Sequence, residues 1–166
     1  MTKQPFELSI RKFQKQDTQE VKRLINDIMH SEFADVLGAF PPDDLENIFD
    51  YYGKAGEAFF VALRENKIIG SIGVKKEDDR TALIRRIFVF PDFRGHHVGG
   101  ELLGKALSFC KEVGYQEIIF KTTSKMKDAI KLFEDNGFHE KVHLKLGPTD
   151  LYKLTYFIRE NSPFSR

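Results

Sequence analysis

The sequence has little of what marks several common protein classes. It contains one cysteine, Cys110, in 166 residues, which excludes an intramolecular disulfide and favours a reducing compartment. No apolar run is long enough to cross a bilayer or to act as a signal peptide. Lys and Arg number 26 against 25 Asp and Glu, so bulk charge attracts neither nucleic acid nor an anionic membrane. We therefore expect a cytoplasmic protein that binds neither.

Metal-binding patterns are also missing. Of the five histidines, only His96 and His97 are adjacent, and no cysteine or carboxylate stands at metal-site spacing from them. The sequence therefore predicts no metal site. A length of 166 residues suits one domain with a proper core, so residues 1–166 are expected to form a single domain.

What the chain does have is a distinctive stretch, Arg94 to Gly100, which reads Arg-Gly-His-His-Val-Gly-Gly. Before it, residues 83–90 are mostly apolar and β-branched, which predicts a buried strand that Pro91 ends. After it, apolar side chains recur at helical spacing over residues 98–113, and Gly114 suits a helix C-terminus. The pattern therefore predicts a strand, a glycine-bearing turn and a helix.

A turn of this kind is a candidate anion site. The first N–H groups of a helix have no intrahelical partners, and the helix dipole adds partial positive charge there. Glycine allows an anion to approach the backbone closely, and Arg94, His96 and His97 add donors at the rim. The alternative is that a helix simply begins after a loop, with Gly95 and Gly99 used for turning and packing. The local pattern favours neither interpretation.

Two familiar phosphate-binding loops do not match. The P-loop needs a lysine followed by serine or threonine after its glycines, and this stretch has neither. The dinucleotide fingerprint needs another glycine spacing and a βαβ unit at the start of the chain.

The rest of the chain predicts a mixed sheet. Residues 58–63 and 68–74 form strand-like runs that short turns connect to each other and to residues 83–90, which predicts antiparallel neighbours. The helix at 98–113 and a strand at 117–122 require a crossover, and therefore a parallel pair. With a first strand at 6–10, a helix at 126–135 and a last hairpin at 138–145 and 151–158 that turns at Gly147-Pro148, we expect an α/β (α+β) fold. It has a twisted sheet of about six or seven strands and about four helices.

Helix starts are predicted from capping residues. Asp17 and Glu20 have capping-box spacing before a helix, and Ser124 is placed to cap a later one. The first helix buries an apolar stripe of Val21, Leu24, Ile25 and Ile28. A second helix is expected from Asp43, with a buried side of Leu45, Ile48, Phe49 and Tyr52.

Two further expectations concern the segments around these helices. Residues 30–40 lack periodicity and are read as a loop. Arg85 and Arg86, neighbours in one strand, are expected on opposite faces. One of them would then reach an acidic acceptor, or each would be a surface charge or a structural pair.

The glycine stretch resembles the acetyl-CoA loop of the GCN5-related N-acetyltransferase (GNAT) family, whose pattern is Arg or Gln, two residues, Gly, one residue, Gly or Ala. Arg94 and Gly99 fit, and His97 stands where the pattern has its first glycine. The resemblance extends in order over most of the chain. It includes Ile10-Arg11 with Asp17, Ile87-Phe88-Val89 with Pro91, Ala129-Ile130, Leu132-Phe133-Glu134 and Gly137-Phe138.

The resemblance implies an N-acyltransferase fold that binds acetyl-CoA as co-substrate. CoA phosphates would bind backbone N–H groups of Gly95 to Gly100, pantetheine would pair with Ile87 to Val89, and the Val89 N–H would donate to the thioester oxygen. An amine acceptor would lie under the first two helices. The residues expected to bind the cofactor are Ile87, Phe88, Val89, Arg94, Gly95, His96, His97, Val98, Gly99, Gly100 and Phe133.

The resemblance does not assign the general base that would deprotonate the amine or the general acid that would protonate the leaving thiolate. Many relatives carry a tyrosine and an asparagine where this chain has Phe133 and Met126, and a glutamate where it has Leu83. Glu32 and Glu57 lie in suitable regions, although each fits a solvated surface better. Phe133 would face the thioester, or instead complete the apolar stripe of its helix.

Three functional hypotheses follow. The favoured one is transfer of an acetyl group from acetyl-CoA to a primary amine of a small molecule, peptide or protein. The second is a catalytically weak acyl-CoA sensor or regulatory module, and the third is a nucleotide-binding domain without transfer chemistry. A homodimer is left open.

Overall fold

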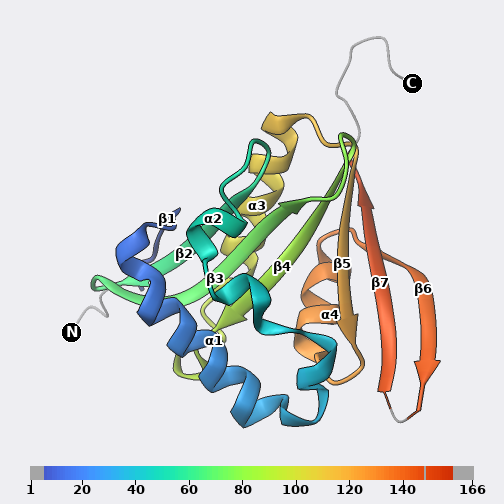
Figure 1. The fold of residues 1–166 in the computed structure, drawn as a ribbon, viewed down its shortest axis with the longest axis horizontal. Helices are drawn as coiled ribbons and strands as arrows, with labels where there is room; N and C mark the ends of the chain where they lie inside the picture. The colour runs from blue at the N-terminus through green and yellow to red at the C-terminus, as the bar shows by residue number, and fades with distance from the viewer. Residues whose placement is uncertain (1–5, 148, 159–166) are drawn as a thin grey trace.

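A seven-stranded mixed sheet runs through the computed structural model, which describes residues 6–147 and 149–158 (Figure 1). The strands lie in the order β1-β2-β3-β4-β5-β7-β6. They are β1 (Ser9–Lys12), β2 (Ala58–Arg64), β3 (Lys67–Lys76), β4 (Thr81–Val89), β5 (Glu117–Thr123), β6 (His139–Leu146) and β7 (Thr149–Phe157). The α-helices are α1 (Thr18–Glu32), α2 (Ile48–Tyr51), α3 (Val98–Val113) and α4 (Lys127–Asp135), and the 3-10 segments are η1 (Lys15–Asp17), η2 (Ala34–Ala39), η3 (Pro42–Leu45) and η4 (Pro91–Phe93).

Hydrophobic side chains form two cores, one on each face of the sheet. Successive strand residues point to opposite faces, so in β2 Phe60 joins the core under α3 while its neighbour Val61 joins the core under α1. Both side chains are at most 1% exposed. The predicted stripe of α1, Val21, Leu24, Ile25 and Ile28, is fully buried in the second core. The central strands are therefore covered on both sides.

The strand pairing confirms the predicted mixed sheet. Strands β2, β3 and β4 form an antiparallel meander, and Glu65 and Asn66 turn the first hairpin at positive φ angles of 50° and 65°. Helix α3 has the predicted bounds and connects β4 to β5, which are parallel. These two strands pair only between Thr81–Ile84 and Glu117–Phe120, and beyond that they diverge (Figure 1). The separation leaves the second half of β4 without a neighbour on the β5 side.

A bulge in β4 overturns the prediction for Arg85 and Arg86. The register with β3 shifts between Ser71 and Gly73, and Arg86 has a left-handed φ of 56°. Since a bulge breaks the alternation of side chains, both guanidinium groups turn towards Asp44 of η3. The expectation that they lie on opposite faces was wrong.

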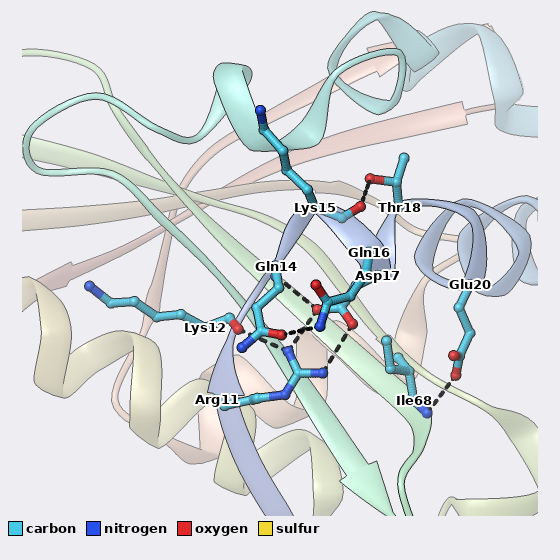
Figure 2. A network of polar contacts seen from close by, with 9 residues as sticks. All are labelled: Arg11, Lys12, Gln14, Lys15, Gln16, Asp17, Thr18, Glu20 and Ile68. Atoms are coloured by element: carbon cyan, nitrogen blue, oxygen red, sulfur yellow. Dashed lines mark hydrogen bonds and ion pairs between the residues drawn. The ribbon is translucent and has the colours of Figure 1, made fainter.

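The start of α1 is held by a different network from the predicted capping box (Figure 2). The Asp17 carboxylate accepts bonds from Arg11, at 2.7 and 3.0 Å, and from the Gln14 N–H, at 2.8 Å. Glu20 does not reach back to Asp17 but accepts the Ile68 N–H at 2.7 Å. The helix begins where predicted, while these two carboxylates connect it to β1 and β3.

Three other local predictions, for residues 30–40, for the second helix and for the Ser124 cap, differ from the structure. Residues 30–40 are not a loop throughout, because α1 continues to Glu32 and η2 follows. The expected second helix is instead a short 3-10 turn, η3, followed by a single turn of α-helix, α2. On the predicted buried side of this helix, Leu45, Ile48 and Tyr52 are buried, but Phe49 is 45% exposed. No side chain caps α4, so Ser124 does not do so.

The C-terminal hairpin is confirmed as antiparallel β6 and β7. Gly147, with a φ of 62°, lies at its turn, while Pro148 lies outside the described residues. Among the described helices, none has both the length and the apolar character that crossing a bilayer requires.

Candidate active site

A cavity of about 1190 Å³ opens where β4 and β5 diverge. Its walls come from both strands, from the turn before α3, from α4, and from α1, η2 and α2 on the other side. Most of β4 contributes, from Leu83 to Val89. The divergence of one parallel strand pair thus creates a groove in the middle of the sheet.

The turn before α3 closes one end of this groove. Gly95 and His97 both have left-handed φ angles, of 86° and 63°, and His97 is the N-cap of α3. A side chain at Gly99 would place its Cβ 3.2 Å from Leu132 and 3.8 Å from Val89, so glycine allows the helix start to pack closely against β4 and α4. The free N–H groups of the first turn of α3 therefore lie beside the groove.

Arg94 connects the turn before α3 to α1 beside the groove. Its guanidinium donates to both carboxylate oxygens of Glu32, each at 2.7 Å, and its Nε donates to the Val89 carbonyl at 3.1 Å. The bond from Arg94 outweighs partial burial and lowers the pKa of Glu32. Glu32 is therefore ionised and paired at neutral pH.

The structure brings most of the predicted cofactor-binding residues to this groove. Those that line it are Ile87, Phe88, Val89, Arg94, Gly95, His97, Val98, Gly99 and Gly100. His96 instead turns to the far side of the turn, where its ring stacks on Phe6 at 4.3 Å. Phe133 is fully buried, 3.9 Å from the ring of Phe120, and does not line the groove. The structure thus places Phe133 in the core, which is the alternative that its helical stripe indicated.

The two glutamates considered as bases have other partners. Glu57 is 8% exposed, lies outside the lining of the groove, and binds Lys75 together with the N–H groups of Lys54 and Lys76. Glu32 lines the groove but is paired with Arg94.

A buried charge cluster lies on the α2 side of the groove, where Arg86 forms the structural pair that was one of the sequence alternatives, although its partner Asp44 was not predicted. Asp44, 1% exposed, accepts bonds from Arg86 at 2.7 and 2.9 Å and from Tyr52 at 2.7 Å. Burial raises the pKa of Asp44, but the bonds from Arg86 and Tyr52 outweigh it and lower the pKa overall. Arg85 lies beside this pair, 3.9 Å from Asp44, and Lys75 contacts the backbone oxygen of Tyr51; both cations line the groove. The only signal in the sequence was a pair of arginines inside an otherwise apolar strand.

No group of three or more His, Cys, Asp or Glu side chains comes together as a metal site within residues 6–147 and 149–158.

The sheet order, the parallel pair that diverges, and the helix start beside it define a protein of the N-acyltransferase fold. The chain belongs to the acetyltransferase (GNAT) family, whose model matches residues 22–138.

Individual relatives agree with this assignment. The chain is 31% identical over 125 residues to N-acetylaspartate synthetase of Danio rerio, a match that covers 74% of this chain and 42% of that protein. A GNAT-family acetyltransferase structure from Staphylococcus aureus Mu50 has a TM-score of 0.76 and 26% identity, covering 89% of this chain and 99% of that one. The structure of yncA from Salmonella typhimurium, determined with its cofactor acetyl-CoA, has a TM-score of 0.76 at 17% identity, covering 96% and 99%, which is a likeness of fold.

Three curated relatives, two N-acetylaspartate synthetases and human N-acetyltransferase 8B, are longer proteins. The chain spans only 36–42% of their length.

Proposed function

We propose that the protein transfers the acetyl group of acetyl-CoA to a primary amine of a small molecule, peptide or protein. Family membership supports this activity, and so do relatives that are named as N-acetyltransferases. The Salmonella protein of the same fold has acetyl-CoA as its cofactor, which supports the same donor here.

One observation carries the proposal: the divergence of β4 and β5 opens into the groove that the start of α3 closes. An extended thioester carrier needs unpaired strand backbone along its length and an anion site at its phosphate end. The second half of β4 offers the first, and the first turn of α3 offers the second.

The residues at the start of α3 fit CoA. Side chains are absent at Gly95, Gly99 and Gly100. Apart from the adjoining backbone, no atom lies within 4 Å of where a Cβ would stand at Gly95 or Gly100, so a phosphate has room to approach the backbone. Acetyl-CoA would supply an activated acyl group with a thiolate leaving group. The chain itself would orient that group by backbone pairing along Ile87 to Val89 and would hold the thioester oxygen with the Val89 N–H.

The binding test is calorimetric titration of the purified protein with acetyl-CoA, CoA and ATP. We expect acetyl-CoA and CoA to bind and ATP to bind far more weakly. Tighter binding of ATP would favour a nucleotide-binding domain and would contradict the proposal.

The activity test is a panel of amines incubated with acetyl-CoA while free thiol is followed. We expect thiol release that depends on the amine, with acetylated amine formed in equal amount. Binding of acetyl-CoA without transfer to any amine in the panel would favour the acyl-CoA sensor.

A further inference from the structure

Charges on the α2 side of the groove do not balance. Three cations, Lys75, Arg85 and Arg86, gather there with two carboxylates, Asp44 and Glu57. Counted together, three positive and two negative charges leave one positive charge, on side chains that are all half-buried or buried. Such a charge is costly unless an anion accompanies it.

Contacts within the cluster place the extra charge on Arg85. Arg86 makes two hydrogen bonds to Asp44, at 2.7 and 2.9 Å, and Lys75 pairs with Glu57 at 2.9 Å. Arg85 lies 3.9 Å from the Asp44 oxygen that already accepts from Arg86. Each carboxylate of the cluster thus has a closer cation than Arg85.

Arg85 is also the member that faces open space in a fixed position. Its side chain is 26% exposed and lines the groove. Its Nη1 donates to the Tyr51 hydroxyl at 2.7 Å, and its guanidinium lies 5.5 Å from the centre of the Tyr51 ring. A guanidinium held in this way keeps other N–H donors for a ligand, and their planar arrangement matches a carboxylate.

The phosphate end of the groove is too far away to supply the anion. Arg85 and Val89 pair with Gly73 and Gly70 of β3, which are three residues apart because the bulge at Arg86 shortens β4, and this corresponds to roughly 10 Å of extended strand. Val89 is the strand residue that lies against Gly99 at the start of α3. Arg85 therefore lies deeper along the groove than the site expected for the CoA phosphates, on the side where α2 and η2 enclose it.

We propose that the acceptor amine carries a carboxylate, which Arg85 and the Tyr51 hydroxyl bind at the α2 side of the groove. The proposal rests on the acetyltransferase function proposed above. A single carboxylate would bring the charge of the cluster to zero, whereas a phosphate dianion would leave it negative. The acceptor class is thus an amino acid, or a peptide whose amine lies near a carboxylate.

The first test compares acceptors that differ only in that charge. We would measure kcat/KM for a set of L-amino acids and for their carboxamides, with the wild type, Arg85→Gln and Arg85→Lys. The exposed Arg23 of α1, outside the lining of the groove, supplies the matched control Arg23→Gln. We expect the wild type to prefer the best acid over its amide by at least about tenfold, which is about 1.4 kcal/mol.

The preference should depend on Arg85 alone. Arg85→Gln should abolish it, Arg85→Lys should keep part of it, and Arg23→Gln should leave both the preference and the rates unchanged. Comparing the acid-to-amide ratio between enzymes cancels the different basicities of the two amines. Thermal melts would show that each variant is folded, and an unchanged preference in folded Arg85→Gln would overturn the proposal.

A binding experiment separates this proposal from the activity on which it rests. The N-acetyl derivatives of the same amino acids and amides would be titrated into the CoA-loaded protein and followed by NMR. We expect at least one acid to bind the wild type more tightly than its amide and to lose that advantage in Arg85→Gln. Selective binding of the acid without acetyl transfer would contradict the proposed acetyltransferase function but would support the carboxylate site.

Three results would contradict the proposed carboxylate site. Equal rates of acetylation for acids and amides would leave the acetyltransferase function without a carboxylate site. A preference for a phosphorylated amine such as phosphoethanolamine over every acid would show that the charge argument is wrong. A loss of acetyl-CoA affinity in Arg85→Gln as large as the loss of acid binding would assign Arg85 to the cofactor.

Discussion

At the scale of single residues, His97 shows how the groove can keep its shape without the expected glycine. It occupies the position that is the first glycine of the family pattern, and it has the left-handed φ of 63° that glycine adopts without strain. His97 thus holds a backbone conformation that glycine would adopt more easily.

We predict that His97→Gly is tolerated and raises the free energy of unfolding by roughly 0.5–1 kcal/mol, because it relieves a left-handed conformation. Chemical denaturation measures this. Gly95→Ala, the reverse change at a nearby position, is the control. Gly95 has a φ of 86° and no side chain close to the added Cβ, so the left-handed backbone alone should make this variant less stable by about 1 kcal/mol. A loss of stability in His97→Gly would mean that the imidazole makes a needed contact.

Phe133 is a residue whose role follows from its burial. Its ring stacks on Phe120 and meets Phe138 edge-on at 4.8 Å, with no exposed surface. We predict that Phe133→Tyr costs roughly 1–3 kcal/mol of stability, because the new hydroxyl is buried without a partner. Turnover per folded enzyme should not change. Faster turnover with unchanged stability would show that the hydroxyl reaches the thioester.

At the scale of elements, the pair of Arg86 and Asp44 attaches η3 to the bulge of β4. Arg86 also donates to the Pro41 carbonyl at 3.0 Å, so one side chain fixes the whole segment over the groove. We predict that Arg86→Met destabilises the protein by about 3–5 kcal/mol, since it leaves a buried carboxylate without its cation. Chemical denaturation measures the loss.

Two further variants test this explanation. Adding Asp44→Leu to Arg86→Met should recover part of the loss, because the buried charge is then gone. Lys131→Met, which breaks the exposed pair with Asp135 in α4, should cost at most about 0.5 kcal/mol. If Arg86→Met cost no more than Lys131→Met, the buried pair would not be what holds η3.

A single substitution also tests the role of the first turn of α3. We predict that Gly99→Asp weakens acetyl-CoA binding by at least about tenfold, or about 1.4 kcal/mol, because it places a carboxylate where phosphate is expected to bind. Its thermal stability should change little, since an acidic residue suits the first turn of a helix. Calorimetry and thermal melts measure the two effects.

Gly99→Ala is the matched control for that experiment. It adds the same Cβ, 3.2 Å from the end of the Leu132 side chain, without the charge. The family pattern also accepts alanine at this position, so acetyl-CoA should still bind. Equal affinity of wild type and Gly99→Asp would count against the phosphate site.

At the scale of the whole molecule, paired carboxylates set the response to acid. Burial raises the pKa of Asp17 and Asp44, but their hydrogen bonds and ion pairs together outweigh it, with Arg11 and Gln14 at Asp17 and with Arg86 and Tyr52 at Asp44. The bond from Arg94 lowers the pKa of Glu32, so all three pKa values lie below their usual range. A carboxylate with a lower pKa in the folded state stabilises the fold above its unfolded pKa. That contribution is lost as the pH falls through the folded pKa.

We therefore predict that stability is nearly constant from neutral pH down to roughly pH 5 and falls below roughly pH 4. Urea midpoints measured between pH 3 and pH 7 test this. Arg94→Gln removes the bond that lowers the pKa of Glu32 and should make the fall shallower. Equal midpoints at pH 3 and pH 7 would contradict the prediction.

The sequence by itself determined those elements that depend on patterns of residues close together in the chain. Apolar spacing placed α3 at its observed bounds, short turns gave the antiparallel meander, and the need for a crossover gave the parallel pair of β4 and β5. The motif from Arg94 to Gly100 indicated the groove, because glycines and a helix start are visible in the order of residues. Each of these depends on neighbours a few positions apart along the chain.

Tertiary structure decided which side chains meet. The bulge at Arg86 directs both arginines to Asp44, which precedes Arg86 by 42 residues in the chain. Glu20 binds the N–H of Ile68 instead of capping its own helix. Phe133 lies outside the groove because α4 packs it against Phe120 of β5 and against Phe138. A periodic pattern shows that a residue is buried, but only packing between distant segments determines what it is buried against.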